Sequence, residues 1–189
     1  MRRHSTTAIV IAAFSVVIHP VVQESAAQRN DPIVESETYK VLSEVIPRGN
    51  LASSGELLIQ RETTIEWMCM GSAAPKDSEW VMALADFRQQ NARTRVLLES
   101  LLPLDVPHRF IARSEIEADD ARLALKYPGQ WQRRPESLEF VAVSAVGFNP
   151  LKTKAVVYVR TRDYGSVRFL ERADGRWVRA SIGGCGWGA

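Results

Sequence analysis

Hydrophobic residues recur every three or four positions in residues 31–49, which predicts a helix. Asp31 can cap its start, and Pro32 suits the first helical position. Pro47 and Gly49 are typical of its end. The apolar face expected to be buried consists of Val34, Tyr39, Val41, Leu42 and Val45.

The clearest helical pattern lies in residues 76–103. Asp77 or Ser78 can cap this helix, and Pro103 stops it. The second half, through Leu97, Leu98 and Leu101, either continues the helix or forms a separate one. The stripe expected to be buried consists of Trp80, Val81, Leu84, Phe87 and Asn91.

A third helix is predicted over residues 114–127, before Pro128-Gly129. Ser114 with Glu117 three positions later matches the capping-box pattern. Residues 55–64 and 108–113 lie between the helices as short runs bounded by turn residues, and we predict a strand in each.

Hydrophobic and polar positions begin to alternate at residue 138, which predicts strands in place of helices. Residues 154–159 are apolar on both faces, as in a central strand, and Asp174-Gly175 joins two β-rich runs into a hairpin. Asn149-Pro150 starts a turn, and Gly147 marks a bulge or a close backbone approach. One face of the first strand would consist of Leu138, Phe140, Ala142, Ser144, Val146 and Phe148.

The order of these elements predicts an α+β fold, with N-terminal helices packed on one face of a C-terminal β-meander of three to four antiparallel strands. We expect the hairpin 166–182 to pair with residues 154–160, and residues 138–148 to join the same sheet. Residues 28–189 would form one domain, with a glycine-rich tail at 183–189.

Four short motifs in the C-terminal half occur in a fixed order: YPG at 127–129, VGFN at 146–149, KAVVYV at 154–159 and LERADGRWV at 170–178. Together with WVMALADFRQQNA at 80–92, they resemble an uncharacterised group of exported bacterial hypothetical proteins. The resemblance covers residues 39–178 and implies no activity. Members of that group often carry a cysteine–glycine pair between the last strands, and RTRDYGSV at 160–167 has no cysteine there.

The first 27 residues have the three parts of a secretory signal peptide. Arg2 and Arg3 are followed by an apolar run at 8–22 and by small residues at the −3 and −1 positions of a cut after Ala27. The alternative is a membrane anchor, for which the apolar run is short. We therefore predict export to the periplasm or the cell exterior, with no membrane span after cleavage.

Charge is nearly balanced along the chain. Without Arg2, Arg3 and Glu24, the 24 basic and 22 acidic residues leave a net charge of +1 for residues 28–189. A nucleic-acid binder needs a concentrated basic face, so we expect no nucleic-acid partner. No dinucleotide or phosphate-loop motif occurs, and we expect no cofactor.

Residues suited to catalysis or metal binding are few. His108 is the one histidine of residues 28–189, and no nucleophile motif accompanies it. Cys69, His108 and Cys185 lack the short spacings of a metal site, so we expect no metal. Asp119 and Asp120 are adjacent on a predicted helix, where their side chains point about 100° apart, which does not suit paired catalytic carboxylates.

Both cysteines would enter an oxidising compartment after export, and their number is even. We therefore predict a disulfide between Cys69 and Cys185. Two unpaired cysteines, or reactive or metal-bound thiols, are the alternatives.

Function is left open by these patterns. We expect a small exported, non-enzymatic binding or structural domain of the bacterial cell envelope. The alternatives are a small exported hydrolase that uses His108 and a small-ligand-binding domain. Trp131 and Trp187 have no obvious place in the core, so either can belong to a binding surface.

Overall fold

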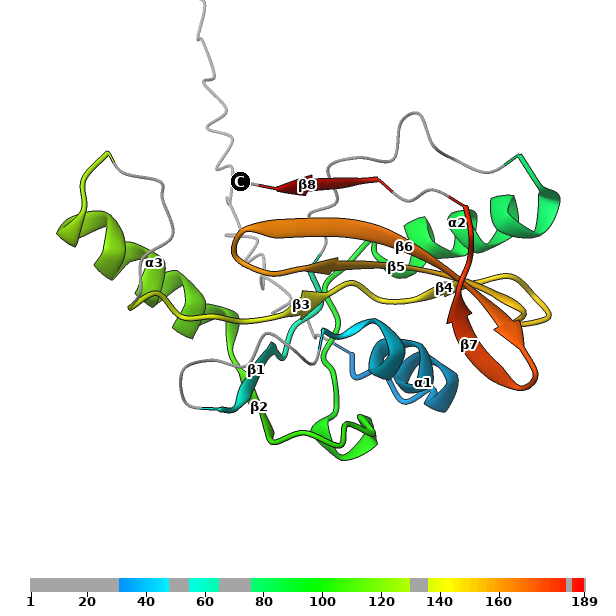
Figure 1. The fold of residues 1–189 in the computed structure, drawn as a ribbon, viewed down its shortest axis with the longest axis horizontal. Helices are drawn as coiled ribbons and strands as arrows, with labels where there is room; N and C mark the ends of the chain where they lie inside the picture. The colour runs from blue at the N-terminus through cyan, green and yellow to red at the C-terminus, as the bar shows by residue number, and fades with distance from the viewer. Residues whose placement is uncertain (1–30, 48–54, 65–75, 130–135, 183–184, 189) are drawn as a thin grey trace, which may run out of the picture.

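A curled antiparallel sheet lies at the centre of the molecule, with helices around it (Figure 1). The computed structural model describes residues 31–47, 55–64, 76–129, 136–182 and 185–188. The helices in these ranges are α1 (Ser36–Val45), α2 (Ser78–Gln90), α3 (Arg113–Lys126) and the short 3-10 helix η1 (Glu99–Leu101). The strands are β1 (Leu57–Gln60), β2 (His108–Ile111), β3 (Ala142–Val143), β4 (Gly147–Phe148), β5 (Lys154–Arg160), β6 (Tyr164–Ala173), β7 (Arg176–Arg179) and β8 (Gly186–Gly188).

The predicted α+β class is confirmed, but the sheet has six strands where three to four were expected. Strand β5 lies between β6 on one side and β3 with β4 on the other, while β7 and β8 both pair with β6. Two differences explain the count. The alternating stretch 138–148 is divided into β3 and β4, and part of the glycine-rich tail forms β8 in place of a free end.

The predicted hairpin is confirmed. Strands β6 and β7 are joined at Asp174 and Gly175, whose φ angles are 49° and 76°. Both values lie in the left-handed region, which is the conformation that a two-residue hairpin turn of this kind needs. Strand β6 pairs with β5 along the whole of β5, as expected from the apolar residues on both faces of that strand.

A one-residue bulge divides β3 from β4. Val143 pairs with Val159 and Gly147 with Val156, so four steps along one strand face three along the other. Before the bulge, the Ser144 N–H donates to the Tyr158 carbonyl (2.9 Å), and the Ser144 hydroxyl accepts the Tyr158 N–H (2.8 Å). Ala145 is then the extra residue.

The bulge makes one sequence-based expectation wrong, because an inserted residue reverses the side on which later side chains lie. Phe140 and Ala142 pack with Ile116 in one small cluster. Val146 and Phe148 lie instead in the main core with α1. The six residues expected on one face are therefore divided between two.

The sequence predicted that the helices would all cover one face of the sheet, and this expectation is wrong. On β5, Val156 and Tyr158 pack with the buried side of α2. Ala155, Val157 and Val159, which alternate with them, pack in the cluster that contains α1. Because alternate residues of a strand point to opposite faces, α1 and α2 lie on opposite sides of the sheet (Figure 1).

Helix α1 begins later than predicted. Its first residue is Ser36, and Asp31-Pro32 forms an extended segment, in which the Ile33 N–H donates to the Val96 carbonyl (2.8 Å). Val34 is therefore exposed and does not belong to the buried face of a helix. The other four residues expected on that face are buried: Tyr39, Val41, Leu42 and Val45.

Helix α2 is confirmed with its cap. The Asp77 carboxylate accepts the N–H groups of Glu79 (2.8 Å) and Trp80 (3.4 Å). Val81 is half exposed, against the expectation for the stripe, and Ala83 takes its place. The second half of the predicted stretch contains only η1, because residues 95–97 run extended and bond to residues 31, 61 and 63.

Helix α3 begins one residue earlier than predicted, and its cap differs. The Glu115 carboxylate accepts the Ala112 N–H (2.8 Å), so Glu115, not Glu117, folds back on the helix start. Ala112 has no side-chain oxygen, so the reciprocal half of a capping box is absent here. Only Ile116 is buried on this helix, which projects from the end of the sheet (Figure 1).

Strands β1 and β2 are confirmed as strands, but they pair in parallel with each other. A parallel pair needs a long connection, and α2 lies within it. Strand β1 also touches the main sheet, since the Gln60 N–H donates to the Val141 carbonyl (2.8 Å). The N-terminal half thus contributes strands as well as helices.

Candidate functional site

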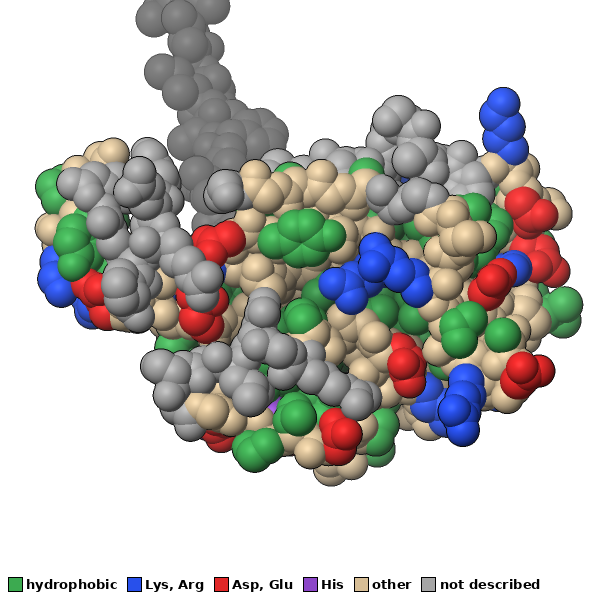
Figure 2. Space-filling model, viewed as in Figure 1, with side chains coloured by type: hydrophobic (Ala, Val, Ile, Leu, Met, Phe, Trp, Pro, Cys, Tyr) green, Lys and Arg blue, Asp and Glu red, His purple; other side chains and the backbone are tan. Residues whose placement is uncertain are grey.

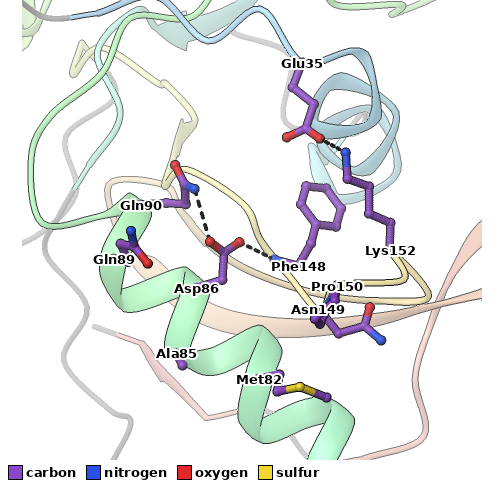
Figure 3. A pocket seen from close by; sticks show the side chains of 10 residues that line it. All are labelled: Glu35, Met82, Ala85, Asp86, Gln89, Gln90, Phe148, Asn149, Pro150 and Lys152. Atoms are coloured by element: carbon purple, nitrogen blue, oxygen red, sulfur yellow. Dashed lines mark hydrogen bonds and ion pairs between the residues drawn. The ribbon is translucent and has the colours of Figure 1, made fainter.

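A groove lies between α2 and the turn that joins β4 to β5 (Figure 3). It is open to solvent, with a volume of about 520 Å³. From α2, side chains at positions 82, 85, 86 and 89 form a helical stripe beside the buried one. The complete lining consists of Glu35, Met82, Ala85, Asp86, Gln89, Gln90, Phe148, Asn149, Pro150 and Lys152.

The turn wall of the groove is held by the buried Asn149. Its Oδ1 accepts the N–H groups of Thr153 (2.8 Å) and Lys154 (2.9 Å), and its Nδ2 donates to the Thr153 hydroxyl (2.9 Å). This confirms the turn expected at Asn149-Pro150. Asn149 therefore supports the wall, since these bonds use its amide.

The floor of the groove is held by Asp86. Its carboxylate accepts the Phe148 N–H (2.7 Å) and the Gln90 side-chain amide (3.1 Å). Gln90 in turn accepts a hydrogen bond from Arg95 (2.7 Å). Asp86 thus ties α2 to β4, and its two oxygens are engaged within the protein (Figure 3).

An ion pair closes one end of the groove. The Lys152 ammonium group bonds the Glu35 carboxylate, which comes from the segment before α1. The same ammonium lies 5.9 Å from the centroid of the Phe148 ring. Side chains from two distant parts of the sequence, the segment before α1 and residues 148–152, therefore meet at this end (Figure 3).

Apolar side chains form part of the lining of the groove: Met82, Ala85, Phe148 and Pro150. Met82, which lines it, is 42% exposed. Leu151 in the turn is 74% exposed, and Val34, next to Glu35 in the chain, is 70% exposed. An open groove with an exposed apolar side chain in its lining is typical of an interaction surface.

His108 does not lie at this groove. It is half buried at the start of β2, and its Nδ1 is 2.9 Å from the Val106 carbonyl oxygen. Among the described residues, this is its one hydrogen bond. No serine, cysteine or carboxylate in the described part of the chain is hydrogen-bonded to its ring, and such a contact is the geometry that a hydrolytic site requires.

Only one of the two cysteines, Cys185, lies in the described residues. The Cys185 carbonyl accepts the Val167 N–H (2.9 Å), and its side chain packs against the cluster under α2. Cys69 lies outside the described residues, so the disulfide stays a prediction.

The structure describes one of the two tryptophans that had no expected place in the core. Trp187 lies on β8, and its indole N–H donates to the Tyr158 hydroxyl (2.9 Å), so the tail is attached to the core. Trp131 lies outside the described residues. Trp80 is buried, as expected from its place in the stripe, and Trp177 is buried as well.

The acidic pair on α3 has a structural role. The Asp119 carboxylate accepts the Leu138 N–H (2.9 Å) and pairs with Arg122 (2.6 Å) and Arg162 (2.8 Å), and Asp120 also bonds Arg162. Burial, the largest single effect, raises the pKa of Asp119, but these bonds outweigh it and the net pKa is lowered. The pair attaches α3 to the sheet.

A second contact attaches the end of α3 to residue 136. Lys126 (2.8 Å) and the Tyr127 hydroxyl both bond the Glu136 carboxylate. Mainly through these two hydrogen bonds, the pKa of Glu136 is lowered to about 2. Because the pKa is lowered, this contact supports the fold above the ordinary pKa of about 4.5 and is lost as the pH falls through about 2.

The described ranges contain neither a group of metal-ligating side chains nor a membrane-spanning helix. No group of three or more histidine, cysteine, aspartate or glutamate side chains in them is arranged to hold a metal ion. None of the helices that the structure describes has the length and apolar character needed to cross a membrane.

Sequence reasoning missed the groove. The only local signal is the second stripe of α2, at 82, 85, 86 and 89, in which small, apolar and amide side chains alternate with one carboxylate. Such a stripe on its own is also typical of a solvated helix face. The turn wall and Glu35 come from distant segments, so no spacing in the sequence indicates them.

Comparisons with known proteins identify no relative. No protein-family model matches the chain, and no curated protein or solved structure is significantly similar to it. The resemblance based on the four C-terminal motifs thus stays a prediction.

Proposed function

We propose that this protein is an exported, non-enzymatic binding domain whose groove between α2 and the β4–β5 turn holds a short segment of a partner protein. One observation carries the proposal: an open groove of about 520 Å³ is lined in part by the apolar residues Met82, Ala85, Phe148 and Pro150, of which Met82 is 42% exposed. Removing such residues from water favours association by roughly 25 cal/mol per Å² buried.

The groove's chemistry supports binding over catalysis. Its lining contains no histidine, serine or cysteine. Asp86 is bonded by Phe148 and Gln90, and Glu35 by Lys152, so each carboxylate already has a partner. An acid–base or nucleophilic site needs a group positioned to exchange a proton with the substrate. The hydrolase alternative has no comparable support, given the contacts of His108.

The partner's chemistry follows from the two walls. Met82 and Ala85, with the turn residue Pro150, suit one or two apolar side chains of an extended peptide. The exposed Gln89 makes no side-chain hydrogen bond within the described residues, so its amide is available to a peptide backbone. A compact small ligand is less well suited, because an open groove buries less of its surface than a closed pocket does.

The predicted signal peptide indicates the compartment in which the protein would meet such a partner. Residues 1–27 have the composition of a signal peptide, with small residues before a cut after Ala27. We therefore propose a periplasmic or extracellular location, with the partner in the cell envelope or outside it. Residues 1–30 lie outside the described ranges, so this part of the proposal depends on the sequence pattern.

The disulfide belongs to the same proposal. We expect the exported protein to carry a bond between Cys69 and Cys185, because oxidising compartments favour disulfides and the chain has two cysteines. The intact mass under non-reducing conditions should be about 2 units below that of the reduced protein, since bond formation removes two hydrogens. Equal masses under both conditions would leave two free thiols and overturn this prediction.

The groove is tested by peptide selection. Peptides selected from a random display library on the mature wild-type protein should contain an apolar residue and should lose at least tenfold in affinity for Met82→Glu, about 1.4 kcal/mol. The reason is that a carboxylate at position 82 must be desolvated against the apolar side chain of the peptide. Titration of labelled peptide, followed by fluorescence anisotropy, measures the affinity.

The matched control is Leu125→Glu, which makes the same kind of change at an 86% exposed position on α3. This variant should bind as the wild type does. Amide resonances of the Gln89 and Gln90 side chains should shift in the wild-type complex. Peptides that bind Met82→Glu and wild type equally, or that shift only residues elsewhere, would place the binding surface outside the groove.

A further inference from the structure

Two arginines lie as neighbours on the face of the sheet that packs against α1. Arg168 on β6 pairs with Val157, and Arg179 on β7 pairs with Leu170. Val157 and Leu170 both belong to the core cluster that contains α1, so both arginines lie on that face. Diagonal neighbours of this kind have Cα atoms about 7–8 Å apart, within reach of two long side chains.

The guanidinium group of Arg168 is held in place. Its Nη1 donates to the Val45 carbonyl at the end of α1 (2.7 Å), and its Nε is 3.4 Å from the Ser166 hydroxyl oxygen. The C-terminal end of a helix favours a positive charge, so this position is reasonable for an arginine. A guanidinium has five N–H donors, and two of them are used here.

Neither arginine has an acidic partner among the residues that the structure describes. Within the described residues, no carboxylate forms an ion pair with the half-buried Arg168 or with the exposed Arg179. Burial and, second, the charge of Arg179 lower the pKa of Arg168. Two cations close together at a partly desolvated position repel each other, and an anion between them would relieve that repulsion.

The Tyr164 side chain lies on the same face of the sheet as the two arginines. Tyr164 precedes Arg168 by four residues on β6, so both side chains leave the strand on one face. A Cβ atom on Gly186 would be 3.4 Å from the Tyr164 hydroxyl oxygen, so this hydroxyl reaches over β8. In the space-filling view, Lys and Arg side chains form a group over the middle of the sheet (Figure 2).

We propose that Arg168 and Arg179, together with the Tyr164 hydroxyl, form a binding site for an oxyanion, the phosphate or carboxylate group of a small ligand. The planar guanidinium presents paired N–H donors that match two oxygens of such a group. Ser166 positions Arg168 by accepting from its Nε. The site shares no residue with the groove, so the two proposals stand or fall separately.

The experiment is an NMR titration of the mature protein with inorganic phosphate at constant ionic strength, which removes general salt effects. The Nε–Hε resonances of Arg168 and Arg179 should shift and saturate, with a Kd on the order of 1 mM. A second arm uses acetate: saturation there as well assigns carboxylate to the site, and saturation by phosphate alone assigns phosphate.

Two variants decide the result. Arg179→Gln should weaken phosphate binding at least tenfold, while Arg176→Gln should bind as the wild type does, because Arg176 is exposed on the same strand and points to the opposite face. Both remove one exposed charge, so folding is not at issue. Shifts that stay linear in both arms, or equal losses in the two variants, would overturn the proposal.

Discussion

Gly147→Ala is expected to destabilise the protein by roughly 4 kcal/mol, a large part of the 5–15 kcal/mol typical of a folded domain. A Cβ atom at position 147 would lie 2.2 Å from the Phe87 backbone N and 2.3 Å from its Cα. Backbone atoms cannot move aside by changing a rotamer, so α2 would have to shift away from β4. That shift would also disturb the hydrogen bond from Phe148 to Asp86.

Thermal and denaturant unfolding followed by circular dichroism measure this effect. For a domain of this size we expect the midpoint to fall by about 10 °C, using 2–4 °C per kcal/mol. Gly188→Ala is the control, since the nearest atom to its added Cβ would be 3.9 Å away. It should change stability by less than about 0.5 kcal/mol. Equal stability of the two variants would mean that α2 and β4 are not in direct backbone contact.

Asn91→Ala is expected to lower the free energy of unfolding by roughly 3 kcal/mol. The buried Asn91 side chain accepts the Ala145 N–H (2.8 Å) and donates to the Ala145 carbonyl (2.9 Å). Ala145 is the extra residue of the bulge, so these bonds satisfy both backbone groups that β5 leaves unpaired. Removing the amide would leave the buried Ala145 N–H without a partner, at about 1–3 kcal/mol, and would leave the Ala145 carbonyl with only the Ser144 hydroxyl (2.8 Å) as a donor.

Urea unfolding, analysed as a two-state transition, measures this loss in the free energy of unfolding. The control is Gln89→Ala, two residues away at an exposed position, which should change stability by less than about 0.5 kcal/mol. Faster hydrogen exchange of the Ala145 amide in Asn91→Ala would locate the effect at the bulge. A cost below about 1 kcal/mol for Asn91→Ala would contradict this role.

Much of the fold could be predicted because its signals are local. The Asp174-Gly175 turn, the Asp77 cap and the apolar residues of β5 each specify structure within a few positions. Turn, cap and central strand were accordingly predicted correctly. The start of α1 was not, because Asp31-Pro32 also suits an extended segment, and pairing with Val96 decides in favour of that segment.

The candidate site could not be predicted, because its parts meet only in the folded chain. Lys152 and Glu35 are 117 positions apart, and Phe148 and Asp86 are 62 apart. Each residue alone is typical of an exposed turn or helix. Only the approach of α2 to β4, which requires Gly147, brings them to one groove.

By itself, the sequence determined the α+β class and the positions of α2 and the β6–β7 hairpin, because these follow from periodicity and from short-range residue preferences. Tertiary structure decided the division of residues 138–148 into β3 and β4, and with it the face on which each side chain lies. The physical reason is that a one-residue bulge costs two backbone hydrogen bonds, which the buried side chains of Asn91, at the end of α2, and of Ser144 replace.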